Sequence, residues 1–219
     1  MVKGVIFDAD GTLLLSMKFW DSMVTHLISC SGVEPCDGLT EILASMSMKE
    51  GAEYLQKEYG VLLSTDEIVK QENEMVEEFY TKDVKLRSGV KDVLGFLKSN
   101  NVKMAVATAT DAYLIVKALE HLGISDCFEK VISCSDVGEG KSSPKVYFSA
   151  CRILGTVPDE TVVAEDNAAA LKTAKNAGFK TIGVYDSDNA SNFDSLFENS
   201  DFLVTDVFDV SVFKALFTV

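Results

Sequence analysis

The chain has 219 residues, of which 47% are hydrophobic and 25% are charged, proportions that are typical of a globular protein. Because one domain takes about 150 residues, this length favours one large domain, or a core with a smaller insertion. Acidic residues outnumber basic residues by 34 to 20, which gives a net charge of −14. This acidity argues against nucleic acid and against anionic membranes as partners, but a locally positive site could still bind a small phosphorylated molecule.

The cysteines and the apolar stretches indicate the cellular compartment of the protein. The five cysteines are widely spaced and include no CxxC pair, which indicates reduced thiols rather than a disulfide framework. No apolar stretch approaches the ~18 residues of a membrane-spanning helix, and the opening MVKGVIFDADG lacks the pattern of a signal peptide. We therefore expect a cytoplasmic protein without a membrane partner, and a monomer by default.

The first 85 residues predict one strand and then a long helical segment. Residues 2–8, VKGVIFD, are β-branched and aromatic and lead into Asp-Ala-Asp-Gly, the pattern of a buried strand followed by a turn. From about residue 17 to residue 82 the apolar side chains recur with helical spacing, and Ser64 is a candidate N-cap before an acidic first turn. Because this segment contains no convincing strand, we expect an all-helical insertion of about 70 residues.

After about residue 86 helices and strands alternate. Helices are expected over residues 90–101, 111–123, 144–155, 167–178 and 191–199 and near the C-terminus, and apolar strands over residues 102–110, 128–134, 161–166, 180–186 and 201–205. This alternation predicts an α/β fold with a Rossmann-like, doubly wound parallel sheet that helices cover on both faces. We expect residues 1–15 and 86–219 to form this core and residues 16–85 to form the inserted domain.

Polar side chains occur at four of the predicted strand ends, where open parallel sheets bind their ligands. The candidates are Asp8 and Asp10 after the first strand, Thr108 and Ala109 after the second, Lys141 in the loop after the third, and Glu165 and Asp166 after the fourth. Each feature alone has an ordinary explanation as a turn, a helix cap or a surface lysine. Because all four occur in order, each following a strand, we interpret them as one functional site.

These side chains have the chemistry that phosphoryl transfer needs. Asp8 and Asp10 share one side of an extended chain, ~6–7 Å apart, and Gly11 allows a tight turn after them. Converging carboxylates are typical ligands of Mg²⁺, and a carboxylate can also accept a phosphoryl group. Thr108 precedes a helix N-terminus, which suits an anion, and Lys141 could neutralise a phosphate. The set therefore predicts a metal, in-line positioning and charge neutralisation at one edge of the sheet.

Four segments carry a family resemblance. They are FDADGTLL (residues 7–14), AVATAT (105–110), GEGKSSPKVYF (138–148) and VVAEDNAAALKTAKNAGFKTIGVYD (162–186). Together they resemble the motifs of the haloacid dehalogenase-like (HAD) superfamily, in particular its phosphatases and β-phosphoglucomutase-like members with a helical cap. The resemblance extends over nearly the whole chain, and it implies that the insertion of residues 16–85 is the cap domain.

The resemblance implies a role for each acidic residue. Asp8 would attack the substrate phosphorus and become an aspartyl phosphate, and Asp10 would protonate the leaving oxygen and then activate water. Mg²⁺ would bind to the Asp8 carboxylate, the Asp10 backbone carbonyl and Asp166. Glu165 would either bind the metal directly or support its ligands.

The resemblance also implies the contacts of the phosphate. Thr108 and the Ala109 backbone would hold the phosphate oxygens, and Lys141 would screen the charges of the nucleophile and the phosphoryl group. The cap would close over the site and contact the rest of the substrate. There, Ser16 and Lys49 are the candidate substrate contacts.

From these features we predict a Mg²⁺-dependent phosphatase that hydrolyses a small phosphorylated metabolite, with sugar phosphates as candidate substrates. A phosphomutase like β-phosphoglucomutase is the alternative. Such mutases usually have a His after the first motif and an Arg on a cap helix, but here no Arg precedes Arg87, which favours hydrolysis. A non-catalytic phosphate-binding protein would not need Asp8, Asp10, Lys141 and Asp166 together. Asp10 also argues against metal-independent dehalogenases and phosphonate-cleaving relatives.

Overall fold

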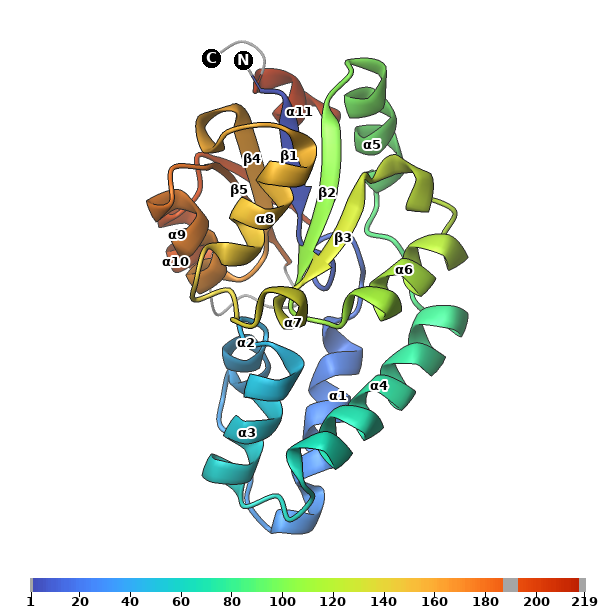
Figure 1. Ribbon diagram of the computed structural model, residues 1–219, viewed down its shortest axis with the longest axis vertical. Coiled ribbons are helices and arrows are strands. Elements are labelled where there is room, and N and C mark those ends of the chain that lie inside the picture. Colours follow the sequence, from blue (N-terminus) through green and yellow to red (C-terminus); the bar gives the residue numbers. More distant parts are fainter. Residues whose placement is uncertain (1, 187–192, 217–219) are drawn as a thin grey trace.

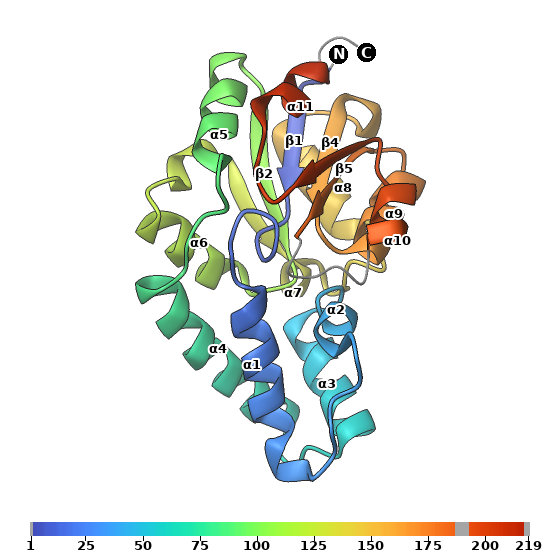
Figure 2. The same cartoon turned by 180° about the vertical axis from the view of Figure 1, so that it is seen from behind.

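A computed structural model describes residues 2–186 and 193–216, and Figures 1 and 2 show it from opposite sides. Its centre is a six-stranded sheet in the order β3-β2-β1-β4-β5-β6, and every neighbouring pair is parallel. The strands are β1 (Gly4–Phe7), β2 (Lys103–Thr108), β3 (Lys130–Ser133), β4 (Thr161–Glu165), β5 (Lys180–Tyr185) and β6 (Phe202–Thr205). The strand order reverses between β1 and β4, which confirms the predicted doubly wound α/β fold.

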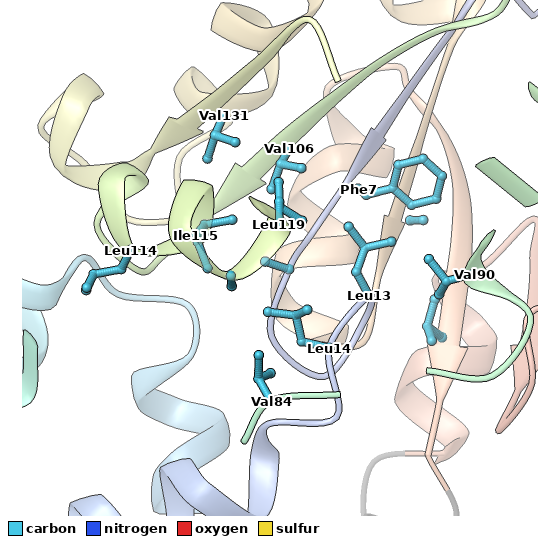
Figure 3. Close-up of a cluster of buried hydrophobic side chains, with 14 of the residues drawn as sticks. Phe7, Leu13, Leu14, Val84, Val90, Val106, Leu114, Ile115, Leu119 and Val131 are labelled. Atoms are coloured by element: carbon cyan, nitrogen blue, oxygen red, sulfur yellow. The ribbon is translucent and has the colours of Figure 1, made fainter. Parts of the chain in front are cut away.

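Successive residues of a strand point to opposite faces of this sheet, and each face has its own core. The helices of this part are α5 (Val90–Ser99), α6 (Ala112–His121), α7 (Cys134–Val137), α8 (Lys145–Leu154), α9 (Ala168–Asn176), α10 (Phe193–Glu198) and α11 (Val210–Ala215). Phe7 of β1 lies in the larger core, beneath α5, α6 and α11, and Figure 3 shows it beside Leu13 and Val90. Ile6 points to the other face, which α8 and α9 cover. Strands buried on both faces explain why their sequences are almost wholly apolar.

The helical segment lies beyond the carboxyl ends of the strands (Figure 1). It consists of α1 (Met17–Ile28), α2 (Leu39–Leu43), α3 (Met48–Tyr59) and α4 (Thr65–Lys82). Ser64 caps α4, because its Oγ accepts from the Glu67 N–H at 3.3 Å while the Glu67 carboxylate accepts from the Ser64 N–H at 2.9 Å. No helix in the described part of the chain is long and apolar enough to cross a membrane.

Two connections join the helical segment to the sheet, and they run side by side. The Leu15 N–H donates to the Lys85 carbonyl oxygen at 2.9 Å. On this basis we propose that residues 16–85 form a cap domain and that residues 1–15 and 86–219 form the core.

Two predicted elements differ in detail from the structure. The strand expected over residues 128–134 ends at Ser133, because Ser133 caps a four-residue helix, α7, with Asp136 closing the capping box. The helix expected over residues 191–199 is described as α10, whereas Ser191 and Asn192 lie outside the described residues.

Arg87 follows the second connection, at Lys85, and forms hydrogen bonds to the turn after β1. Its guanidinium is buried and donates to the carbonyl oxygens of Gly11 at 2.5 Å and Thr12 at 3.1 Å. It also forms an ion pair of 2.9 Å with Asp186, just after β5. One side chain thus joins the first strand end, the cap connection and the far half of the sheet.

We predict that Arg87→Ala destabilises the protein by about 3 kcal/mol, because it leaves buried acceptors without a partner. For a chain of this size this corresponds to a decrease in Tm of roughly 6–12 °C, which thermal melting followed by circular dichroism would measure. Arg152 is exposed, so Arg152→Ala is the matched control and should change Tm little. Equal melting temperatures for the two variants would contradict this role of Arg87.

Candidate active site

The first strand ends in a tight turn that carries Asp8. The Asp8 N–H donates to the Ala164 carbonyl oxygen at 2.9 Å, which ties the end of β1 to β4. Gly11 has a φ angle of +75°, and a Cβ atom at this position would collide with the Asp166 carboxylate. The glycine therefore lets the turn lie directly against Asp166, whose Oδ1 accepts a hydrogen bond of 3.0 Å from Thr12.

Three carboxyl groups gather around one ammonium group at this edge. One oxygen atom from each of Asp8, Glu165 and Asp166 lies within 4.8 Å of the other two. Lys141 Nζ donates to Asp8 Oδ1 and, at 2.7 Å, to Glu165 Oε2. Asp8 is 5% exposed, and Lys141 and Glu165 are each 1% exposed, so water screens these charges little. The two strand ends and the Lys141 loop thus meet in one buried cluster.

Burial and repulsion shift the pKa values of this cluster. Burial raises the pKa of Asp8, the Glu165 charge raises it further, and Lys141 opposes both effects. Burial and the Glu165 charge also raise the pKa of Asp166 to about 7. Burial acts to lower the pKa of Lys141, but the Asp8 and Glu165 carboxylates outweigh it and raise that pKa well above its ordinary value. The cluster is therefore short of positive charge.

These residues could hold a divalent cation. Mg²⁺ takes oxygen ligands, commonly one or two carboxylates, and keeps several waters. Asp8, Glu165 and Asp166 present carboxylate oxygens close together, and a further positive charge would relieve the repulsion among them. The donor set and the charge of the cluster both fit Mg²⁺.

The Asp10 carboxylate is not part of this cluster and is held by hydroxyl groups instead. Asp10 Oδ1 accepts from Ser16 Oγ at 2.7 Å and from the Tyr80 hydroxyl, and Asp10 Oδ2 accepts from Thr110 Oγ1 at 2.8 Å. Ser16 is fully buried. The structure therefore places Ser16, a candidate substrate contact, against Asp10. Ser16 and Tyr80 lie near the start and the end of the helical segment, so the segment contacts Asp10 directly.

A cavity lies between the sheet and the helical segment, and all the candidate residues of the core except Lys141 line it. From the core it is lined by Asp8, Asp10, Thr108, Ala109, Thr110, Glu165 and Asp166. From the helical segment it is lined by Met17, Trp20, Val24, Thr40, Leu43, Ala44, Met46, Ser47, Met48, Gly51 and Glu72. The core side is thus polar and the opposite side is mainly apolar.

The second candidate substrate contact, Lys49, does not line this cavity. Its side chain is 75% exposed and lies 3.9 Å from Glu53 on the surface of α3. Its neighbours Ser47 and Met48 line the cavity instead. The start of α3 faces the site, but the rotation of the helix directs Lys49 away from it.

Sequence reasoning missed Thr110, Tyr80 and Glu72. Thr110 lies two residues beyond Thr108, in the same strand end, and its hydroxyl contacts Asp10. Tyr80 and Glu72 belong to a buried stripe of α4 with a spacing of four residues, which consists of Ile68, Glu72, Val76 and Tyr80. An acidic residue within such an apolar stripe is a signal that the sequence does contain.

Comparison with known proteins shows the family of the chain. Residues 5–184 match the haloacid dehalogenase-like hydrolase family. A phosphorylated carbohydrates phosphatase of Thermotoga maritima is 27% identical over 189 residues, which cover 86% of this chain and 88% of that protein. The β-phosphoglucomutase of Bacillus subtilis is 24% identical over 192 residues, which cover 84% of this chain and 83% of that protein.

Solved structures share the fold. The crystal structure of β-phosphoglucomutase from Clostridium difficile superimposes with a TM-score of 0.82 at 19% identity, covering 100% of this chain and 98% of that one. A putative β-phosphoglucomutase from Thermotoga maritima gives a TM-score of 0.70 at 25% identity, with both chains fully covered.

We predict that Mg²⁺ stabilises the protein through Asp166. A ligand at 100 times its Kd adds about 2.7 kcal/mol, which corresponds to a rise in Tm of roughly 5–10 °C. Asp166→Asn should abolish most of this rise, whereas Asp159→Asn, which changes an exposed aspartate, should preserve it. The measurement is thermal melting with increasing MgCl₂ after treatment with EDTA. The same rise in the Asp166→Asn variant would show that Mg²⁺ binds elsewhere.

Proposed function

Because the chain belongs to the haloacid dehalogenase-like hydrolase family, we propose that it is a Mg²⁺-dependent phosphatase of small phosphomonoesters such as sugar phosphates. The observation that carries the proposal is the buried cluster in which Lys141 contacts both Asp8 and Glu165, with Asp166 beside them. A carboxylate nucleophile and metal-binding acids at one end of a cavity, with a cation in contact with the nucleophile, form the arrangement that phosphoryl transfer requires.

Asp8 is the proposed nucleophile. Its oxygen attacks the phosphorus while the bond from phosphorus to the leaving oxygen breaks, which produces an aspartyl phosphate and the free alcohol. Lys141 contacts the Asp8 carboxylate and offsets the negative charge that gathers there. Thr108 and Ala109 line the cavity beside Asp8, where their hydroxyl and backbone groups can hold the phosphoryl oxygens.

Asp10 is the proposed acid and base. In the first step it gives its proton to the leaving oxygen. In the second step it takes a proton from water as the water oxygen attacks phosphorus and the bond to Asp8 breaks, which releases phosphate. Hydrogen bonds from Ser16, Thr110 and Tyr80 fix its carboxylate at the cavity.

Asp8 and Asp166, with Glu165 beside them, are the side chains that would hold Mg²⁺, together with the Asp10 backbone carbonyl that the family resemblance implies. Bound there, the metal would supply positive charge for the phosphoryl oxygens. The excess of carboxylates over ammonium groups in the cluster supports this assignment.

The lining of the cavity favours hydrolysis over phosphoryl transfer between sugar positions. A mutase must bind a substrate with a second phosphate, which needs cationic partners away from the reacting centre. Among the described residues that line the cavity from the helical segment, none is Lys or Arg. The relatives named as phosphatases support hydrolysis, and those named β-phosphoglucomutase keep the mutase as the alternative.

We predict that the purified protein releases phosphate from sugar phosphates with Mg²⁺ and that Asp8→Asn abolishes this release, because an amide cannot replace the nucleophile. Asp10→Asn should lower kcat by about 10²–10⁴-fold, the usual contribution of a general acid and base. Asp159→Asn is the control. With β-glucose 1-phosphate as substrate, the product should be free phosphate. Formation of glucose 6-phosphate instead would favour the mutase, and full activity of Asp8→Asn would contradict the mechanism.

A further inference from the structure

Glu72 is a buried acid that the proposed chemistry does not use. It lies on α4, is 5% exposed and lines the cavity opposite the core residues. Its Oε2 atom is buried and has no hydrogen-bond partner in the described part of the chain. Native proteins rarely leave a buried polar atom unpaired, because this costs about 1–3 kcal/mol and more for a charged group.

The surroundings of Glu72 offer it no compensation. Burial and the charge of Asp111, which has the same sign, raise its pKa to about 8. Both Asp111 oxygens are already engaged, one with Asn73 Nδ2 at 3.1 Å and one with Ser135 Oγ at 2.7 Å. The other residues that line the cavity from the helical segment are apolar or neutral, and the one indole donor among them, Trp20 Nε1, is buried and makes no hydrogen bond to Glu72. A partner for Glu72 must therefore come from a molecule in the cavity.

The helix places Glu72 well away from the reacting phosphate. Tyr80, on the same buried stripe, contacts Asp10, and Glu72 precedes it by eight residues. At 1.5 Å per residue this separates the two positions by about 12 Å along the axis of α4. The core end of the cavity is suited to the phosphate, and the Glu72 end is suited to the alcohol part of the substrate.

We infer that Glu72 is a specificity-determining residue that binds a hydrogen-bond donor, a hydroxyl or an ammonium group, on the non-phosphate end of the substrate. The inference rests on the proposed phosphatase function and specifies its substrate class. The substrate is a phosphomonoester whose other end is a neutral polyol or an amine. Above pH 8, where Glu72 is ionised, substrates that carry a second phosphate or a carboxylate at that end are rejected, because their charge then meets the Glu72 carboxylate in a buried site.

The test compares substrates that differ only at the end remote from the phosphate. Sorbitol 6-phosphate and 6-phosphogluconate have the same length and differ in a terminal hydroxyl against a carboxylate. Glucosamine 6-phosphate and glucose 6-phosphate compare an ammonium group with a hydroxyl. Acetyl phosphate, which is too short to reach Glu72, reports the phosphatase reaction itself. The readout is kcat/KM for each compound at pH 9, above the pKa of about 8 to which burial raises Glu72, so that its side chain is ionised.

The wild-type protein should prefer sorbitol 6-phosphate to 6-phosphogluconate by about tenfold or more. Glu72→Gln should lower this ratio at least about fivefold, and Glu72→Lys should reverse the preference. Glu74→Gln changes an exposed acid on the same helix, whose side chain is 68% exposed, and should keep the wild-type ratio. A preference for glucosamine 6-phosphate that Glu72→Gln removes would identify the donor as an ammonium group, and no such preference would identify it as a hydroxyl.

Other outcomes overturn the inference in ways that can be told apart. If the wild type and Glu72→Gln discriminate equally, or if the wild type prefers the carboxylate, Glu72 does not select the substrate, while turnover of acetyl phosphate leaves the phosphatase function standing. If the wild type hydrolyses none of these compounds, the proposed function and the inference both fail. Thermal melting verifies folding, since replacing the buried acid with its amide should not lower Tm.

Discussion

The site depends on one buried ammonium group. Lys141 connects Asp8, the proposed nucleophile at the end of β1, to Glu165, at the end of β4, across the point where the strand order reverses. Without its charge, two carboxylates from neighbouring strands would face each other in a region from which water is largely excluded. Burying these like charges costs free energy, so the surrounding hydrogen bonds and the pairing with Lys141 are needed to hold them in place.

The core also donates hydrogen bonds to backbone carbonyl groups of the helical segment. The Lys141 N–H donates to the Ser45 carbonyl oxygen at 2.6 Å, and Asn167 Nδ2 donates to the Glu41 carbonyl oxygen at 2.8 Å. A Cβ atom at Gly140 would lie 2.5 Å from that Ser45 oxygen, so the glycine permits the contact. Lys141, which holds the charges of the cluster, thus follows Gly140, which permits the contact with the helical segment, and this links exclusion of water to the proposed chemistry.

The strand-end residues could be predicted from the sequence, whereas those of the helical segment that face the cavity could not. Parallel strands bring their carboxyl ends to one edge, so the positions of Asp8, Thr108 and Glu165 along the chain were enough to place them together. The direction of Lys49 depends on how α3 is rotated against the core, and the sequence does not determine this rotation. Glu72 lies in an apolar stripe that the sequence shows. This pattern predicts that the residue is buried, but it does not predict which groups the side chain faces.

The central claim is that Lys141 enables Asp8 to accept a phosphoryl group, and trapping of the phosphoenzyme tests it most directly. The enzyme is mixed with substrate and Mg²⁺ and quenched in acid within milliseconds, and peptide mass spectrometry locates the phosphoryl group. We predict that Asp8 is phosphorylated in the wild type and is not phosphorylated in Lys141→Met. Lys145→Met changes an exposed lysine nearby and is the control, in which Asp8 should be phosphorylated as in the wild type. Circular dichroism verifies that Lys141→Met is folded. Equal phosphorylation of Asp8 in Lys141→Met, or a phosphoryl group on another residue, would contradict the account.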